Sequence, residues 1–141
     1  RILGAGAVGV YTHNTGEVAA MVLLASETDF VSKNEEFVAL AREIAMHVAA
    51  QDPKYVSREQ VNEEAITKAK EVFKEDIKDK PADMQEKILE GKLNAYFKEQ
   101  ILMEQPFIKN PEVTIGEMVN GAVQKFGEKV SIVDFKRLSV K

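Results

Sequence analysis

The sequence lacks several residue types and patterns that particular functions require. It contains no cysteine, which excludes disulfides, thiol nucleophiles, iron–sulfur clusters and cysteine-rich zinc sites. The two histidines, His13 and His47, do not have the spacing of a local metal site. The longest uncharged apolar stretch, residues 18–26, is far shorter than the roughly 20 residues that a membrane-spanning helix needs. We therefore expect a soluble protein with no metal, no cofactor and no membrane segment.

Length and charge bound the domain count and the class of partner. The 141 residues include 19 Lys and Arg against 23 Asp and Glu, which gives a net charge of −4. This sign disfavours a protein that binds nucleic acid directly by neutralising phosphates. The length fits one domain, residues 1–141, and the 45% hydrophobic content can supply a sizeable core. Because the chain begins with Arg1 rather than methionine, we expect it to be part of a longer protein.

A β-hairpin is predicted near the start of the chain. Residues 6–13 are small or β-prone, residues 17–26 are mostly apolar, and Asn14-Thr15-Gly16 between them offers a glycine for a positive φ angle. Residues 18–25 do not alternate between apolar and polar, which is typical of a strand covered on both faces. Helices of this chain can cover one face. The other face requires a second layer.

Four helices are predicted in the middle of the chain. Three of them start at the spacing of a capping box, Ser/Thr-x-x-Glu/Gln, which occurs at Ser32 to Glu35, Ser57 to Gln60 and Thr114 to Glu117. The remaining helix starts at Pro81, whose missing N–H is not needed in a first turn. Asp52-Pro53 is expected to end the first helix and Gly127 the last. The prolines at 106 and 111 predict a loop between the third and fourth helices.

The C-terminal residues 130–140 predict a third strand, because they are rich in β-branched and aromatic residues. Their alternation slips near Val133, which indicates a bulge. Strands at both ends of the chain with helices between them are typical of an α+β domain. We therefore expect a three-stranded antiparallel sheet with about four helices packed on one face.

The glycine-rich start, Gly4-Ala5-Gly6-Ala7-Val8-Gly9, matches the dinucleotide-binding pattern G-x-G-x-x-G, and Asp29 lies about 20 residues beyond it. That pattern binds pyrophosphate only where a strand precedes it and a helix begins within it. Here a strand and a tight turn are predicted instead. The preferred interpretation is that small residues let a strand pack closely, with a nucleotide-binding enzyme as the alternative.

The sequence favours a binding protein over an enzyme. His47 falls on a predicted helix, where a packed histidine is the usual case, and His13 ends a strand beside a turn, where it is either a plain surface residue or a partner contact. No nucleophile-elbow sequence supports a Ser/His/Asp triad. Most carboxylates fall on solvated helix faces, so paired-acid catalysis has no specific signal either.

The segment Glu27-Thr28-Asp29-Phe30-Val31 joins the apolar strand to the first helix. An exposed aromatic ring beside a carboxylate at such a junction can insert into a partner while the charge acts on nearby ions. The alternative is that Thr28 or Asp29 caps the helix and Phe30 packs on the core. Physical reasoning on these residues alone favours the alternative.

Several motifs of this sequence resemble the elongation factor Ts family. The first is the run Glu27-Thr28-Asp29-Phe30-Val31-Ser32-Lys33-Asn34-Glu35. It is followed by Ala45-Met46-His47-Val48-Ala49-Ala50, by Pro53-Lys54-Tyr55-Val56, and by the segments 90–93, 104–109 and 126–130. The likeness spans nearly the whole chain in the family's order.

The resemblance implies a guanine-nucleotide exchange factor that binds elongation factor Tu in the cytoplasm during translation elongation, without enzyme activity or a cofactor. It implies that Thr28, Asp29, Phe30 and Val31 lie beside the magnesium and phosphate end of the GTPase's nucleotide site, with the Phe30 ring inserted as a wedge. His13 matches a position that contacts another domain of elongation factor Tu. Phe126, where the family often has isoleucine, and Gly127 match positions near the interface.

The resemblance also implies a domain organisation. It covers the family's core, or dimerisation, region, and the family's N-terminal ubiquitin-associated-like domain has no counterpart in residues 1–141. One Thr-Asp-Phe-Val motif and one set of strands match the short form of the family, in which two identical chains pair. We therefore predict a homodimer through the sheet face, as the all-apolar strand independently requires. The alternative is a dimerisation module without exchange activity of its own.

Overall fold

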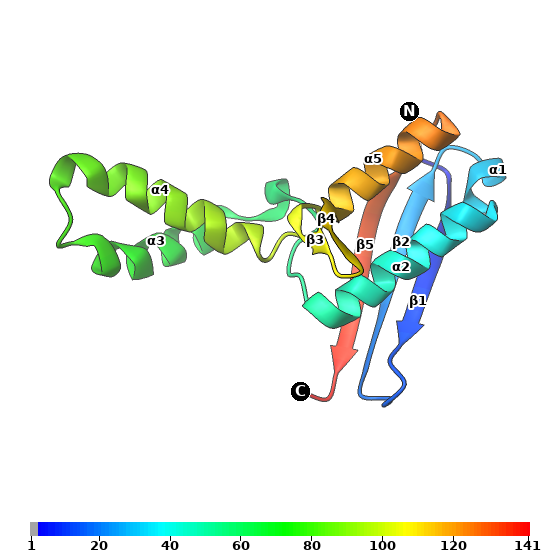
Figure 1. Cartoon of the computed structure of the whole chain (residues 1–141), viewed down its shortest axis with the longest axis horizontal. Helices are drawn as coiled ribbons and strands as arrows, with labels where there is room; N and C mark the ends of the chain where they lie inside the picture. Colours follow the sequence, from blue (N-terminus) through cyan, green and yellow to red (C-terminus); the bar gives the residue numbers. More distant parts are fainter. Residues whose placement is uncertain (1–2) are drawn as a thin grey trace.

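The computed structural model describes residues 3–141 and contains a three-stranded antiparallel sheet in the order β1-β2-β5. The strands are β1 (Ala5–Thr12), β2 (Val18–Ser26) and β5 (Ser131–Ser139). Helices α2 (Glu35–Gln51) and α5 (Ile115–Phe126) cross one face of this sheet (Figure 1). The α+β class and the three-stranded antiparallel sheet are confirmed.

The predicted turn and the predicted bulge both occur in the sheet. Gly16 has a φ of 76°, and the His13 N–H donates to the Val18 carbonyl at 2.9 Å to close the turn between β1 and β2. In the pairing of β2 with β5, Leu23 lies opposite Asp134 and Leu24 opposite Ile132. Val133 is therefore the extra residue of a bulge, at the point where the alternation of the sequence slips.

The N-cap of α2 lies two residues after Ser32, the serine expected to cap it. Asn34 is the N-cap, and its side chain accepts the Glu36 N–H at 2.8 Å. The capping box predicted at Ser32 is wrong, because Ser32 ends a separate short helix, α1 (Asp29–Ser32). There the Ser32 side chain is buried and its hydroxyl donates to the Asp29 carbonyl. Helix α2 ends at Gln51, and its C-cap Asp52 lies in the left-handed region with a φ of 49°, directly before the proline expected to stop the helix.

Gly9 allows α2 to lie close against β1. A Cβ at Gly9 would overlap the backbone carbonyl of Ala41 on α2, so no larger residue fits without moving the helix. The backbone from Ala5 to Thr12 is a strand rather than the start of a helix. The glycine-rich start therefore serves close packing, and the conditions for a dinucleotide site are not met.

The inner face of the sheet, α2 and α5 share one hydrophobic core. Apolar burial of this kind is the main driving force of folding. Its fully buried side chains include Phe37, Ile44, Val48, Val22, Leu24 and Ile115. The core therefore lies between one face of the sheet and two helices, and no element within residues 3–141 covers the opposite face of the sheet.

A helical hairpin extends away from the sheet (Figure 1). It consists of α3 (Glu63–Ile77) and α4 (Ala82–Lys98), which pack against each other around a small cluster with Ala69, Phe97 and Ile101. The expected helical layer on one face of the sheet therefore consists of α2 and α5. The helices α3 and α4 do not pack on the sheet, because their narrow apolar stripes pack against each other. Pro81 precedes α4 as its N-cap residue.

The start of α3 differs from its predicted capping box. Ser57 precedes a single 3-10 turn, η1 (Arg58–Gln60), and its side chain makes no cap. The Gln60 side chain that would complete a box accepts the Val56 N–H at 2.7 Å instead. Asn62 caps α3 by accepting the Ala65 N–H at 2.8 Å, so the box predicted at Ser57 is wrong.

The region predicted as a loop around Pro106 is a small antiparallel hairpin. A 3-10 turn, η2 (Leu102–Glu104), leads into β3 (Pro106–Phe107) and β4 (Asn110–Thr114). Residues before a proline favour extended backbone, which suits a short edge strand as well as a loop. The loop prediction is therefore corrected to a two-stranded hairpin.

The capping box predicted at Thr114 is confirmed at the start of α5. The Thr114 hydroxyl accepts the Glu117 N–H at 3.1 Å, and the Glu117 carboxylate accepts the Thr114 N–H at 2.8 Å. Gly127 ends α5 with a φ of 69°, as expected. This left-handed residue turns the chain toward β5.

Candidate functional site

Phe30 has the largest exposed fraction, 92%, of the exposed large hydrophobic side chains in the described part of the chain. It lies on α1, at the junction of β2 and α2. We call residues 27–34 the α1 corner. Because its ring faces solvent, Phe30 does not pack on the core, and that alternative from the sequence is wrong.

Thr28 occupies the N-cap position of α1, but its side chain does not cap the helix. Its hydroxyl instead donates to the carboxylate of Glu128 at 2.6 Å. Asp29 is the exposed first residue of α1, directly before Phe30. The corner therefore presents a carboxylate and an aromatic ring side by side.

The exposed residues of the α1 corner lie on a backbone that is held from below. Val31 is 7% exposed and belongs to the core, so its side chain anchors the segment. The neighbouring Asp29 and Phe30 side chains remain exposed to solvent. The Ser26 hydroxyl donates to the Thr28 carbonyl at 3.0 Å. Asp29, Phe30, Lys33 and Asn34 line a surface hollow of about 320 Å³. Such a preformed surface can bind a partner without first being ordered.

The turn after α5 is bonded to the α1 corner, 100 residues earlier in the chain. The Glu128 carboxylate accepts the N–H of Glu27 at 3.2 Å and the N–H of Thr28 at 3.1 Å. In return, the Glu27 carboxylate accepts the Lys129 N–H at 2.6 Å. Glu128 was not among the predicted site residues, although it lies in the segment 126–130 that resembles the family and directly follows Gly127.

These bonds bring Phe126 and Gly127 to the same end of the molecule as Phe30. Phe126 is half-buried and packs edge-on against Phe37, with ring centroids 6.2 Å apart. Gly127 is exposed. The ring of Phe126 thus contacts the core, while the backbone after it reaches the α1 corner.

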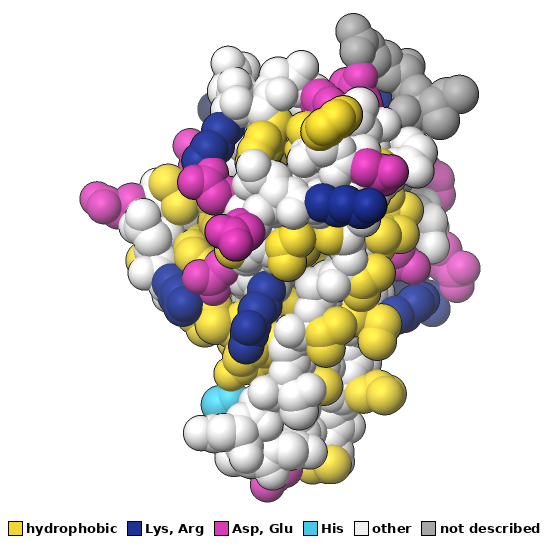
Figure 2. Space-filling view, turned by 90° about the vertical axis from the view of Figure 1, so that its right-hand side faces the viewer, with side chains coloured by type: hydrophobic (Ala, Val, Ile, Leu, Met, Phe, Trp, Pro, Cys, Tyr) yellow, Lys and Arg dark blue, Asp and Glu magenta, His cyan; other side chains and the backbone are white. Residues whose placement is uncertain are grey.

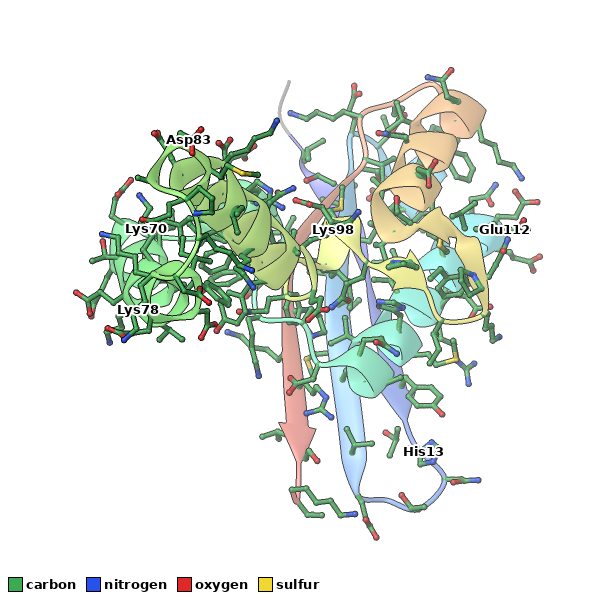
Figure 3. All side chains as sticks on the ribbon, turned by 60° about the vertical axis from the view of Figure 1, so that its left-hand side comes forward. His13, Lys70, Lys78, Asp83, Lys98 and Glu112 are labelled. Atoms are coloured by element: carbon green, nitrogen blue, oxygen red, sulfur yellow. The ribbon has the colours of Figure 1, made fainter. Side chains whose placement is uncertain are left out.

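His13 lies apart from the other predicted site residues. Figure 3 places it beside the turn between β1 and β2, and Figure 1 shows α1 at the other end of these strands. The length of β2, about 30 Å at the usual rise per residue, separates the two positions. The Tyr11 hydroxyl lies 3.0 Å from Nδ1 of the exposed His13 ring. The predicted site therefore has two separate parts.

The outer face of β1 and β2 is apolar and exposed, whereas β5 places the charged Asp134 and Lys136 opposite Leu23 and Met21 on the same face. Val8 lies opposite Leu23 and Val10 opposite Met21 across β1 and β2, and these four side chains are 37% to 57% exposed. Figure 2 views the molecule from the side of α1 and β1 and shows hydrophobic side chains on both sides of its middle part, between charged ones. Residues 20–24 of β2 thus alternate between the core and this open face, although all five are apolar.

His47 is buried where α2 meets the β3–β4 hairpin. Its Nε2 lies 2.9 Å from Oε1 of Gln105, and its Nδ1 accepts the Ile108 N–H at 3.2 Å. An accepting Nδ1 places the ring proton on Nε2, so the imidazole is neutral. Burial lowers the pKa of His47, against the opposing effect of its bond to Gln105. His47 is a packed histidine, as its helical position predicted.

Neither a metal cluster nor a membrane helix is found in the described part of the chain. No group of three or more His, Asp or Glu side chains within residues 3–141 is placed to hold a metal ion. None of the helices in these residues is both long enough and apolar enough to span a bilayer.

Comparisons with known proteins give one consistent family. The family model described as Elongation factor TS matches residues 2–141. Elongation factor Ts of Carboxydothermus hydrogenoformans is 42% identical over 142 residues, covering 99% of this chain and 65% of that protein. Elongation factor Ts of Thermodesulfovibrio yellowstonii is 45% identical over 136 residues, covering 96% of this chain and 68% of that protein. The chain thus spans about two thirds of the length of these relatives.

Proposed function

The chain belongs to the elongation factor Ts family, and from this premise we propose that it binds elongation factor Tu and promotes release of GDP during translation elongation. The family match confirms the resemblance found in the sequence. The partner and the exchange activity are the proposal, and the geometry of the α1 corner supports them.

The observation that carries the proposal is the exposed ring of Phe30 on a fixed backbone. Leaving such a side chain in water forgoes about 1.5–3 kcal/mol of hydrophobic stabilisation. Burial against a partner recovers it, and a few buried aromatic side chains often dominate the energetics of an interface. Phe30 is therefore suited to bind a partner rather than to stabilise the fold.

In the proposed mechanism, Phe30 inserts between side chains of the GTPase beside the magnesium and phosphate end of its nucleotide site. Asp29, next to the ring, brings a negative charge into the same region. This charge repels the phosphates and competes for the positive charges that hold them, which weakens GDP binding. His13 contacts a second domain of the partner, and Phe126 and Gly127 lie near the first contact.

The coupling between this factor and GDP is reciprocal. If binding of the factor weakens GDP by some ratio, GDP weakens the factor by the same ratio. This displacement breaks no covalent bond, so the proposal requires no catalytic base, metal or cofactor from this chain. We place the protein in the cytoplasm with its partner, without a role for nucleic acid or a membrane.

We also propose that two copies of the chain pair through the outer face of the sheet. Val8, Val10, Met21 and Leu23 form two adjacent apolar rows there. A two-fold interface places the same patch on both copies, so one apolar patch supplies both sides. Pairing would bury the second face of β2, which its unbroken apolar run requires.

The dimer is tested by placing a charge on this face. Met21→Lys is expected to give a monomer in sedimentation velocity at concentrations where the parent chain is a dimer, because each interface would bury two unpaired ammonium groups. Val72→Lys, an exposed position on α3, is the matched control and keeps the dimer. A parent chain that sediments at 15.7 kDa at all concentrations would contradict the proposal.

Exchange activity is tested by the release of a fluorescent GDP analogue from elongation factor Tu. The parent chain at micromolar concentration is expected to accelerate release, Phe30→Ala to lose most of the acceleration, and the exposed-residue control Val72→Ala to keep it. Equal acceleration by Phe30→Ala and the parent chain would reject the wedge mechanism.

The exposed sheet face also favours a second candidate, a dimerisation module without exchange activity of its own. The two candidates differ in one result. A parent chain that forms dimers but leaves the rate of GDP release unchanged at micromolar concentration is a dimerisation module without exchange activity. A parent chain that accelerates release is an exchange factor.

A further inference from the structure

The carboxylate of Glu128 is bonded to the backbone that leads into α1. One oxygen accepts the N–H groups of Glu27 and Thr28, at 3.2 and 3.1 Å, and the other accepts the Thr28 hydroxyl at 2.6 Å. Hydrogen bonds to an ionised acceptor are stronger than bonds between neutral groups. One side chain from the end of α5 thus satisfies three donors of the α1 corner.

The position of Glu128 is itself fixed on both sides. Gly127 before it adopts the left-handed conformation that ends α5, and Val130 after it is 5% exposed in the core. The Lys129 N–H donates back to the Glu27 carboxylate at 2.6 Å. The two turns are therefore joined by bonds in both directions, and neither can move without breaking them.

The direction of the Phe30 ring depends on this backbone. The ring is 92% exposed, and α1 has four residues, far fewer than a helix needs to be stable by itself. The Thr28 side chain does not cap α1, and its hydroxyl donates to Glu128. Holding residues 27 and 28 therefore sets where α1 begins and where Phe30 points.

We infer that Glu128 is a positioning residue for nucleotide exchange, which holds the first turn of α1 so that Phe30 and Asp29 are presented in the orientation that binds the GTPase. This inference deepens the proposed function and rests on it. Glu128 acts through the α1 corner, since its two oxygens are already occupied by donors of its own chain. Without it, the corner must be ordered during binding, which lowers the rate of exchange.

The first test needs no partner. In the free protein, amide hydrogen exchange at Glu27 and Thr28 is measured by NMR in the parent chain, Glu128→Ala and Glu128→Gln. We expect exchange at these two amides to become roughly tenfold faster or more in Glu128→Ala, because each N–H loses its acceptor. Glu128→Gln keeps an acceptor oxygen and should change these rates by less than roughly threefold. Unchanged protection in Glu128→Ala would overturn the inference.

The second test asks whether Glu128 acts through Phe30. Glu128→Ala is expected to lower the acceleration of GDP release roughly tenfold, with rescue by Glu128→Gln. In a double-mutant cycle, Glu128→Ala should add little to Phe30→Ala, because two residues that act through one contact are not additive. Glu112→Ala, which removes an exposed carboxylate beyond the opposite end of α5, is the matched control and keeps the parent rate. Additive effects, or no rescue by glutamine, would overturn the positioning role.

The two tests separate this inference from the proposed function. If the parent chain and Phe30→Ala are equally inactive on elongation factor Tu, the exchange function fails, and the positioning of α1 is then judged by amide exchange alone. If the parent chain is active and Glu128→Ala is as active as the parent, the exchange function stands and the role of Glu128 is rejected.

Discussion

Phe30 and Phe37 lie seven residues apart, yet they occupy opposite environments. Phe37, on α2, is fully buried and packs edge-on against Phe126. Phe30, on α1, is almost fully exposed above the buried Val31. A phenylalanine therefore supplies packing energy in one region and is left exposed to solvent in the other. The comparison implies that the α2 core and the α1 corner can be perturbed separately.

The largest expected effect is on the core side of this comparison. Phe37→Ala removes a fully buried ring and leaves a cavity, so we expect a loss of about 3–5 kcal/mol in the free energy of unfolding. Urea denaturation followed by circular dichroism measures it, with Phe30→Ala as the matched control. A loss below about 1 kcal/mol would show that α2 does not pack as described.

A smaller effect is expected beneath the corner. Val31→Ala removes buried methyl groups directly under α1, and we expect a loss of about 1.5–3 kcal/mol in unfolding free energy. The same denaturation experiment applies. If Val31→Ala is as stable as the parent chain, the core does not hold the α1 corner. The exposed Phe30 ring would then not lie on a fixed backbone.

Acid is expected to weaken the core region through His47. Because burial lowers its pKa in the folded state, the unfolded chain binds more protons as the pH falls, so folding is favoured less. The stabilising contribution is complete above about pH 6.5 and decreases below it, by about 1 kcal/mol for the lost Ile108 bond. Urea midpoints at pH 7.5 and pH 5 measure this loss. His47→Gln should reduce the pH dependence, and His13→Gln should leave it in place.

The smallest stability effect is expected at Phe30 itself. Phe30→Ala should change the unfolding free energy by less than about 0.5 kcal/mol, because an exposed side chain loses few contacts. The same variant should lose exchange activity. A large loss of stability in urea denaturation would place Phe30 in the fold rather than in an interface.

Local signals in the sequence predicted much of the fold. The turn at Gly16, the capping box at Thr114 and the bulge at Val133 depend on residues close together in the chain. The boxes at Ser32 and Ser57 were wrong because other contacts occupy those side chains or their partners. The sequence predicted the helices α3 and α4 but not that they pack on each other away from the sheet, since an apolar stripe does not indicate which surface it packs against.

The candidate site was harder to predict. The spacing around Phe30 fits both an exposed wedge and a residue packed on the core, and only its position on α1 separates them. Glu128 could not be identified as a partner of Thr28, because 100 residues separate them and no local pattern joins them. Family resemblance identified Phe30, Asp29 and His13, whereas the structure showed that His13 lies at the far end of the sheet.

The most direct test of the central claim follows Phe30 and Phe37 in one sample. The chain contains seven phenylalanines, so uniform labelling with 4-fluorophenylalanine gives a small set of fluorine NMR signals, assigned from Phe30→Ala and Phe37→Leu. On saturation with unlabelled elongation factor Tu, we predict that the Phe30 signal shifts and loses its sensitivity to exchange of H₂O for D₂O, while the Phe37 signal stays nearly unchanged. A Phe30 signal that keeps its position and its solvent sensitivity in the saturated complex would contradict the account.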